Sequence, residues 1–473
     1  MSKSAPSPTS PNGPIASARW RPLVQVAAMA CLSTVACGFA QAENLVDLYQ
    51  AAKGYDAAYL SAKAQAESVQ YQTEQAHALF RPSLGLGGAL TRSRFEAATQ
   101  PTANQLAQAQ LYNLPPGGNS TSTSRTIGLT AKQTLFNQAD SAKVDQAEQA
   151  LIAAQADLTI AENELATKLT QAYFDVLSAE DVLNTTQANK KGLSEQLASA
   201  KRNFEVGNAT ITDTREAQAR FDLAAAQEIA ATNDLQVKHI ALDQLVGRAD
   251  VKPSPLLTPV KLDALAPGKM SDWVAQADQS PSVRKANVGL VVAKLEVDKA
   301  KAGHMPVLDA VAKLSRTGID SASASLKSSA GNTASIGLEL NMPLYAGGSV
   351  QNRVKEVLAL QEKAERDVDL AKRTVSLITR QAFSGVQSGL AQVKAYEAAE
   401  TSAKLALEAT QLGYRVGVRI NKDVLDAQTQ VTSTQKDLYK ARYDVIVGSV
   451  KLKQAIGVLK PEDLIELNKL VAQ

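Results

Sequence analysis

The chain has 473 residues, and its charges nearly balance, with 50 lysines and arginines against 47 aspartates and glutamates. This balance gives no support to nucleic-acid binding, which requires a strongly basic surface. Only 4% of the residues are aromatic, while alanine, glutamine, leucine and valine fill long tracts, a composition typical of long helices with small side chains at their contacts.

The first 42 residues are predicted to be a secretory signal peptide. Basic residues precede an apolar run at 23–39, and Ala40-Gln41-Ala42 follows as a small-x-small cleavage site. Both cysteines of the chain lie in the apolar run, so we expect a mature chain without disulfides that depends on packing or assembly for its stability. A lipid anchor on Cys37 is the alternative, although the residues before it form a poor lipoprotein box.

The remainder contains two copies of one unit, which are related by an offset of 210 residues. Val206-Gly207 aligns with Val416-Gly417, and far downstream Val246-Gly247 aligns with Ile456-Gly457. Chance does not preserve one offset over such a length, so the chain is predicted to consist of two structural repeats. The predicted order is a first repeat at 43–247, a linker at 248–270, a second repeat at 271–457 and a C-terminal segment at 458–473.

Each repeat begins with a predicted helix and continues into a β-hairpin. From residue 83 the apolar residues recur at every second position, as in Leu84, Leu86 and Leu90, which is typical of a strand with one apolar face. The polar stretch at 92–125 is expected to be a loop. The predicted helices cover 44–80 and 271–302, and the predicted strands cover 83–92, 126–136, 307–316 and 334–345.

An apolar face opposite a polar face suits a sheet with lipid on one side and water on the other. About ten residues per strand is the length that crosses a bilayer at a tilt. A soluble sandwich is the alternative, but no other apolar element is predicted to face these strands. Four strands also leave two unpaired edges, which lipid does not tolerate. Several chains are therefore expected to close one barrel, with a multiple of four strands and at least about eight.

A long helix follows each hairpin, predicted at 138–202 and at 349–412. Leucine and alanine alternate in steps of three and four along the first of these helices, which is coiled-coil packing. At ~1.5 Å per residue the segment is about 100 Å long, too long for the interior of a compact domain. Return helices are predicted at 212–246 and 422–456, after each glycine-marked turn. The chain is therefore expected to form a stalk that projects from a membrane barrel.

Several short motifs occur in a fixed order along the chain. They include Ala172-Tyr173-Phe174-Asp175-Val176-Leu177, Pro343-Leu344-Tyr345-Ala346-Gly347-Gly348 and Gly413-Tyr414-Arg415-Val416-Gly417. In these motifs, and in their spacing over about 43–470, the chain resembles the TolC family of outer-membrane channels, which serve type I secretion and multidrug efflux.

The resemblance implies a mainly α-helical fold with a small β part, assembled as a homotrimer. Four strands from each chain would close a 12-stranded transmembrane β-barrel, which continues into a long α-helical coiled-coil barrel with a mixed equatorial region. The implied location is the outer membrane of a Gram-negative bacterium, in contact with its lipid and with the helical stalk in the periplasm. The implied partners are a periplasmic adaptor (membrane fusion) protein and an inner-membrane ABC or proton-driven transporter.

The second glycine-marked turn is followed by two aspartates, Asp423 and Asp426, which are three residues apart and share one helix face. By resemblance they correspond to the pore constriction, where the carboxylates of a trimer would favour cations and raise one another's pKa values. The alternative is structural, since aspartates in a first helical turn stabilise the macrodipole and cap free amides. Lys422 replaces the apolar residue usual in the family, and it could pair with either aspartate and weaken an acidic ring.

The resemblance also assigns a gate and a docking surface to the two turns. The gate is held closed by bonds between neighbouring helices, and its latch residues correspond to Thr212, Asp213, Tyr414 and Arg419. An arginine fork and a tyrosine hydroxyl suit bonds of ~1 kcal/mol each, which the docking of a partner can replace. Surface pairs at an ordinary helix turn are the alternative. Glycines also simply terminate helices, but by resemblance the adaptor docks at Val206, Gly207, Val416 and Gly417.

No residue pattern indicates catalysis, a cofactor or a metal site, because the three histidines are isolated and no cysteine remains in the predicted mature chain. The predicted function is a passive exit duct, gated at its periplasmic tip, that conducts substrates handed over by an inner-membrane transporter. A partner-independent porin and a trimeric coiled-coil adhesin or structural protein are the alternatives. No motif specifies the cargo or the energy source of the transporter.

Overall fold

The computed structural model describes most of the chain that follows the predicted signal peptide. The described residues are 44–96, 102–112, 120–257, 260, 262, 264–321 and 329–471. The chain separates into two units, 1–41 and 42–473, and all described residues belong to the second unit. The predicted signal peptide, with Cys37, lies outside the described residues. Within the described ranges, no helix combines the length and the apolar character needed to span a bilayer.

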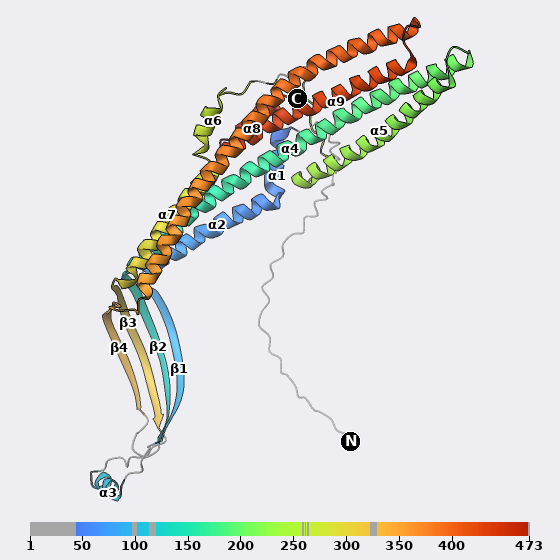
Figure 1. The fold of residues 1–473 in the computed structure, drawn as a ribbon. Coiled ribbons are helices and arrows are strands. Elements are labelled where there is room, and N and C mark those ends of the chain that lie inside the picture. Colours follow the sequence, from blue (N-terminus) through green and yellow to red (C-terminus); the bar gives the residue numbers. More distant parts are fainter. Residues whose placement is uncertain are drawn as a thin grey trace, which may run out of the picture. The chain divides into compact units, whose positions relative to one another are not determined.

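The described part of the chain is mainly α-helical with one small sheet, as predicted. Its helices are α1 Leu45–Tyr55, α2 Ala57–His77, α3 Ala103–Leu111, α4 Gln138–Glu205, α5 Ile211–Val246, α6 Met270–Ala277, α7 Pro281–Lys301, α8 Ser349–Arg415, α9 Asn421–Ile456 and α10 Pro461–Asn468. Short 3-10 turns follow two of them, η1 Ala78–Phe80 and η2 Ala302–His304. The strands are β1 Ser83–Phe95, β2 Ser120–Phe136, β3 Val307–Ser321 and β4 Ser329–Asn341. The sheet extends from one end of the long helices, and the turns of the helical hairpins lie at the other end (Figure 1).

The sheet has one apolar and uncovered face. Its strands lie in the order β1-β2-β3-β4, and every neighbouring pair is antiparallel, so β1 and β4 are free edges within one chain. The register aligns the predicted apolar rows, since Leu86 is opposite Leu129, which is opposite Leu314. Leu86 is 71% exposed and Leu314 is 55% exposed, which places a row of leucines at the surface of the chain.

The opposite face of the sheet is polar and internally bonded. The hydroxyls of Thr126 and Thr317 lie 3.2 Å apart. The Thr134 hydroxyl donates to Asp309 Oδ1 at 2.9 Å, and Lys132 Nζ lies 2.8 Å from Asp309 Oδ2. A barrel closed from such sheets would turn the polar face toward a water-filled interior and the leucines toward lipid.

Two antiparallel helical hairpins form the stalk. α4 pairs with α5, and α8 pairs with α9, while α4 also packs along α9 and thereby joins the two hairpins (Figure 1). α4 has 68 residues and α8 has 67, which at ~1.5 Å per residue makes each helix about 100 Å long.

A buried core lies where the linker and the C-terminal segment meet the long helices. Tyr173 and Phe174 of α4 pack edge to face with ring centres 5.3 Å apart, and the Tyr173 hydroxyl donates to the carbonyl oxygen of Ser254 at 3.1 Å. Leu256 of the linker forms an antiparallel bridge with Val471. Both segments therefore pack against the same helices, as the mixed equatorial region of the resemblance requires.

Two of the predicted helices are each broken once. The helix expected at 44–80 is broken at Asp56, where the backbone is extended and the carboxylate accepts from Tyr59 N at 2.7 Å to cap α2. The helix expected at 271–302 is interrupted between α6 and α7. Ser280 caps α7 there, and the proline that follows occupies the first helical position, where its missing amide hydrogen is not needed.

The predicted loop at 92–125 is mostly structured among the described residues. β1 continues to Phe95, β2 begins at Ser120, and α3 lies between the two strands. The strands extend beyond the apolar rows because ladder hydrogen bonds join backbone groups and need no apolar side chains. Arg92 opposite Thr123 is one such pair.

Candidate functional site

The two hairpin turns repeat one backbone structure. Gly207 has φ 79° and Gly417 has φ 81°. Gly207 N donates to Phe204 O at 3.0 Å, and Gly417 N donates to Tyr414 O at 3.1 Å. A Cβ on either glycine would meet no atom within 4 Å. The left-handed backbone, and not a lack of space, therefore requires glycine at both tips.

Both tips present apolar side chains to solvent beside these glycines. Val206 is 67% exposed and Val416 is 65% exposed, so the predicted docking residues are accessible in the single chain. The second tip exposes two further apolar residues, Val418 at 78% and Ile420 at 60%. This pair was not among the predicted site residues, although apolar residues in a turn where polar ones are usual could have indicated it.

The two return helices begin differently. In α5, Thr210 and Asp213 form a capping box, in which Asp213 N donates to Thr210 Oγ1 at 3.2 Å and Thr210 N donates to Asp213 Oδ2 at 2.9 Å. In α9, Ile420 occupies the cap position and makes no side-chain cap. Asp423, the counterpart of Asp213, instead lies with Oδ2 3.6 Å from Arg419 Nη1. The structural capping role thus describes Asp213 and not Asp423.

Asp426 lies between two cations. Its Oδ1 accepts from Arg220 Nη2 of α5 at 2.7 Å, and its Oδ2 accepts from Lys422 Nζ at 2.6 Å. The hydrogen bond from Lys422 holds the pKa of Asp426 below its usual range, and the same bond raises the pKa of Lys422. The expected pairing of Lys422 with one of the aspartates is confirmed for Asp426. Within one chain the charged carboxylate is stabilised, whereas a ring of carboxylates alone would raise these pKa values.

Arg220 is the tip residue that sequence reasoning missed. Its partner Asp426 is 206 positions away and belongs to the other repeat, so no local pattern connects the two. With Arg220 included, the tip pairs three basic side chains with only two carboxylates, through the contacts Arg419–Asp423, Lys422–Asp426 and Arg220–Asp426.

The tips are also held side by side within one chain. Asn203 Nδ2 of α4 donates to the Tyr414 hydroxyl at 3.3 Å, and Gln196 Nε2 of α4 donates to the buried Asn421 Oδ1 at 2.8 Å. Among the described residues, no hydrogen bond or ion pair joins the predicted latch residues of the first tip, Thr212 and Asp213, to Tyr414 or Arg419. A latch between these two sets would therefore have to form between neighbouring chains.

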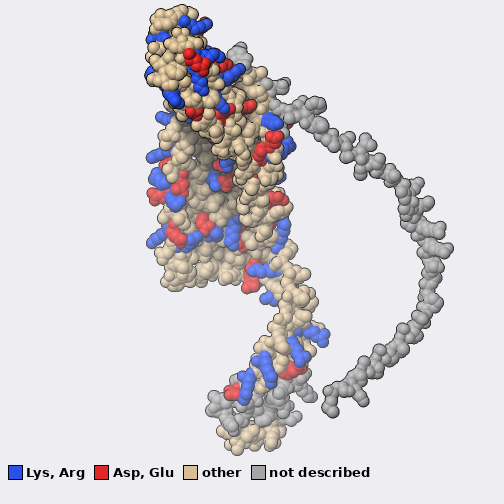
Figure 2. All heavy atoms as spheres, turned by 90° about the vertical axis from the view of Figure 1, so that its right-hand side faces the viewer, with Lys and Arg blue, Asp and Glu red and all other residues tan. Residues whose placement is uncertain are grey.

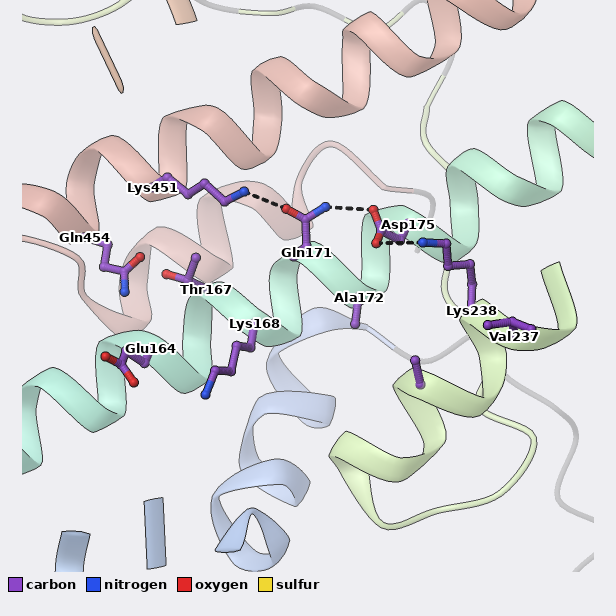
Figure 3. Close-up of a pocket in the computed structure, with 11 residues that line it drawn as sticks. Glu164, Thr167, Lys168, Gln171, Ala172, Asp175, Val237, Lys238, Lys451 and Gln454 are labelled. Carbon is purple, nitrogen blue, oxygen red and sulfur yellow. Dashed lines mark hydrogen bonds and ion pairs between the residues drawn. The ribbon is translucent and has the colours of Figure 1, made fainter. Parts of the chain in front are cut away.

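A pocket of about 390 Å³ lies further along the stalk, between α4, α5 and α9. Figure 3 shows a chain of polar contacts along it, in which Lys451 Nζ donates to Gln171 Oε1 at 2.9 Å and Gln171 Nε2 donates to Asp175 Oδ1 at 2.7 Å. Lys238 Nζ of α5 lies 3.4 Å from Asp175 Oδ2. These contacts connect the three helices, and nowhere in the described ranges do three His, Cys, Asp or Glu side chains gather in a way that could hold a metal ion.

Comparisons with known proteins identify the family. The model of the family described as "outer membrane efflux protein" matches residues 48–248 and 275–458. The chain is 30% identical to the outer membrane protein TolC of Vibrio cholerae over 453 residues, which cover 94% of this chain and 97% of that protein. It is 32% identical over 306 residues to the alkaline protease secretion protein AprF of Pseudomonas aeruginosa, covering 64% of this chain and 63% of that protein. The solved structure of the outer membrane protein VceC of Vibrio cholerae matches with a TM-score of 0.72 at 20% identity, over 87% of this chain and 96% of that one. The chain therefore belongs to the outer membrane efflux protein family.

Proposed function

We propose that the chain is the exit duct of a tripartite efflux or type I secretion system, which conducts substrates passively from an inner-membrane transporter across the periplasm and the outer membrane. One observation carries the proposal, namely the union in one chain of an incomplete two-faced sheet and helical hairpins about 100 Å long. A diffusion porin requires only the sheet, and an adhesin requires helices without a lumen.

The unfinished surfaces of the single chain support assembly with further copies, and we propose a homotrimer. The edges β1 and β4 carry backbone groups that lipid cannot satisfy, and four strands from each of three chains would close a 12-stranded barrel. The stalk has unfinished surfaces as well, because Leu370 and Leu377 of α8 are 63% and 56% exposed and Ile229 of α5 is 73% exposed. Neighbouring chains would cover these side chains and close the helical barrel.

The periplasmic end of this duct is the gate. Asp423 and Asp426 line its constriction, and Tyr414 and Arg419 of one chain bond to Thr212 and Asp213 of the next. The exposed turns at Val206-Gly207 and Val416-Gly417 receive the helical tips of a periplasmic adaptor. Docking there replaces latch bonds of ~1 kcal/mol each and shifts the tip toward its open state. Passive conduction of this kind requires no catalytic residue and no cofactor.

Two measurements on the purified assembly, without partners, test the proposal. In planar lipid bilayers we expect a small, steady conductance, because the barrel is open and the tip is closed. In a liposome swelling assay we expect slow uptake of sugars for the same reason. The absence of any current would instead indicate a solid stalk, and rapid swelling would indicate a partner-independent porin.

A further inference from the structure

The apolar face of the sheet ends in arginines toward its distal end, away from the stalk. Directly opposite residues of an antiparallel pair share one face. Ile127 is opposite Arg316, and Arg316 is opposite Asn332, so these three side chains belong to the face that carries Leu129 and Leu314. Two residues from Ile127 toward the distal end of β2, the same face carries Arg125.

A pocket of about 370 Å³ marks the place where the leucines give way to the arginines. Eight residues line it, namely Leu86, Ile127, Gly128, Leu129, Leu314, Ser315, Arg316 and Asn332. The Arg316 side chain is exposed, and it makes no hydrogen bond or ion pair with any described residue. The pocket therefore has an apolar floor, and the guanidinium group of Arg316 beside it has no partner among the described residues.

The height of Arg316 in the membrane follows from its position in β3. On the leucine-bearing face, the apolar row of β3 begins near the stalk at Leu308, which is opposite Leu340 of β4. Arg316 lies eight residues further along β3. At ~3.4 Å per residue and a tilt of about 40° these eight residues rise by about 20 Å, against an apolar band of roughly 25 Å in outer-membrane barrels. Because the distal end of the sheet points away from the stalk (Figure 1), Arg316 lies near the boundary of the outer leaflet, within reach of its head groups.

Further arginines surround this boundary. Arg125 lies 3.2 Å from Asp320, with both side chains on the same face. Arg92 is exposed on that face and makes no hydrogen bond or ion pair with the described residues. Figure 2 shows lysine and arginine side chains gathered over the sheet with few acidic ones among them, whereas both signs are interspersed over the helices. Guanidinium groups without a protein partner at a lipid boundary are well placed to bind the anionic groups of lipid heads.

We propose that this pocket binds an acyl lipid of the outer leaflet that carries a net negative charge on its phosphates. One acyl chain lies on the aliphatic floor, and the phosphate accepts hydrogen bonds from Arg316, whose planar fork matches two phosphate oxygens. Asn332 adds an amide donor beside it. Arg125 and Arg92 contact further anionic groups of the same head-group layer. The inference uses the family's place in the outer membrane and is independent of the gate and of the transported cargo.

Native mass spectrometry of the full mature assembly in detergent tests the site with three probes, namely a bisphosphorylated acyl glycolipid, phosphatidylethanolamine and inorganic phosphate. We expect the glycolipid to remain bound at least about fivefold more than phosphatidylethanolamine, because the glycolipid carries two phosphates and the single phosphate of phosphatidylethanolamine is neutralised by its own ammonium group. Inorganic phosphate should not remain bound, because it has no acyl chain for the aliphatic floor. Arg316→Ala should lower the retained glycolipid about fivefold. Lys313→Ala is the matched control, since Lys313 is a cation on the opposite face of the same strand, and it should bind as the unmodified protein does.

Two further variants keep the test decisive if Arg316→Ala fails to assemble. Arg316→Lys keeps the charge but loses the fork, and Asn332→Ala loses the amide, so each should lower glycolipid retention about twofold. Unchanged retention in both variants would overturn the proposal, as would equal losses in Arg316→Ala and Lys313→Ala. Equal binding of the glycolipid and phosphatidylethanolamine would reduce the pocket to unspecific lipid contact and would also overturn it.

Discussion

Lys422 changes the electrostatics of the tip, because it neutralises Asp426 from one helical turn away. Replacing it by glutamine removes the shorter of the two contacts on that carboxylate and leaves Arg220 as the one cation bonded to it among the described residues. We therefore expect Lys422→Gln to raise the ratio of cation to anion permeability roughly twofold or more. The reversal potential of single channels in a potassium chloride gradient measures this ratio.

The control for this variant is Lys363→Gln, because Lys363 forms the same kind of pair with Asp367, also with Nζ and Oδ2 2.6 Å apart, in the first third of α8 and far from the tip. It should leave the permeability ratio unchanged. The variant at 422 also has a pH signature. The bond from Lys422 lowers the pKa of Asp426, so without it the carboxylate takes up its proton at a higher pH. Acidification from pH 7 to about 3 should therefore reduce the gain in the variant, because Asp426 is then increasingly protonated, whereas a gain that this acidification does not change would remove Asp426 from the pore.

Arg419 is the residue through which the latch is best tested. Arg419→Ser removes the guanidinium that contacts Asp423 in the chain and that would reach Asp213 of a neighbour. Losing bonds of ~1 kcal/mol per chain should raise the open population about fivefold for each bond, and with it the conductance in planar bilayers. Arg415→Ser removes an exposed arginine that makes no bond with the described residues, and it should have no effect. An unchanged conductance of the closed channel in Arg419→Ser would rule out the latch.

Local residue patterns predict the chemistry of the tip only in part. The pairing of Lys422 with an aspartate could be predicted, because two residues one helical turn apart share a face whatever the tertiary structure is. Arg220 could not, because its contact with Asp426 exists only after α5 and α9 have packed together. The different starts of the two return helices have a local signal in retrospect, since Thr210 can cap a helix and Ile420 cannot.

At the scale of elements, glycines that end helices differ in how much room surrounds them. Gly457 ends α9 with φ 72°, and a Cβ there would lie 2.1 Å from Pro281 Cδ of α7. Gly417 has a similar φ of 81° but no neighbouring atom within 4 Å. We expect Gly417→Ala to cost ~1 kcal/mol of unfolding free energy from backbone strain alone, and Gly457→Ala to cost an additional 1–3 kcal/mol, roughly, from overpacking.

Thermal unfolding of the two alanine variants in detergent checks this difference. The Tm of Gly457→Ala should fall clearly below that of Gly417→Ala, with the unmodified protein as reference. Equal losses would mean that α7 moves away from α9 without cost, and that the packing at Pro281 is loose.

Long elements could be predicted from the sequence with their bounds nearly right, and short interruptions could not. The periodicity of α4 extends over 68 residues, so a few exceptions do not hide it. The break at Asp56 depends on a single carboxylate that accepts from Tyr59 N, and an aspartate inside a helical pattern is compatible with an unbroken helix. The hydrogen-bonded pairing of β1 with β2 continues through polar positions such as Arg92, and the alternation of apolar residues does not predict this extension.

At the scale of the whole molecule, the free edges predict which strands meet between chains. We expect a cysteine in place of Gly87 on β1 to form disulfides with cysteines in place of Ser335, Gly337 or Glu339 on β4 of a neighbour, because all four positions share the polar face. Oxidation should then give a ladder that ends at covalent trimers in a denaturing gel. A cysteine in place of Thr130 on the inner strand β2 is the control and should give none. If the chains remain monomeric after oxidation with each of the three β4 cysteines, the barrel is not closed by strands from neighbouring chains.

The two unfinished edges of the sheet also have a genetic consequence. If each barrel takes one third of its strands from each of three copies, a chain that enters the assembly but blocks its lumen disables its two companions. In a cell that makes normal and blocking chains in equal amounts, only about one assembly in eight would be wholly normal. Alleles that spoil conduction should therefore be dominant, and alleles that prevent strand pairing should be recessive.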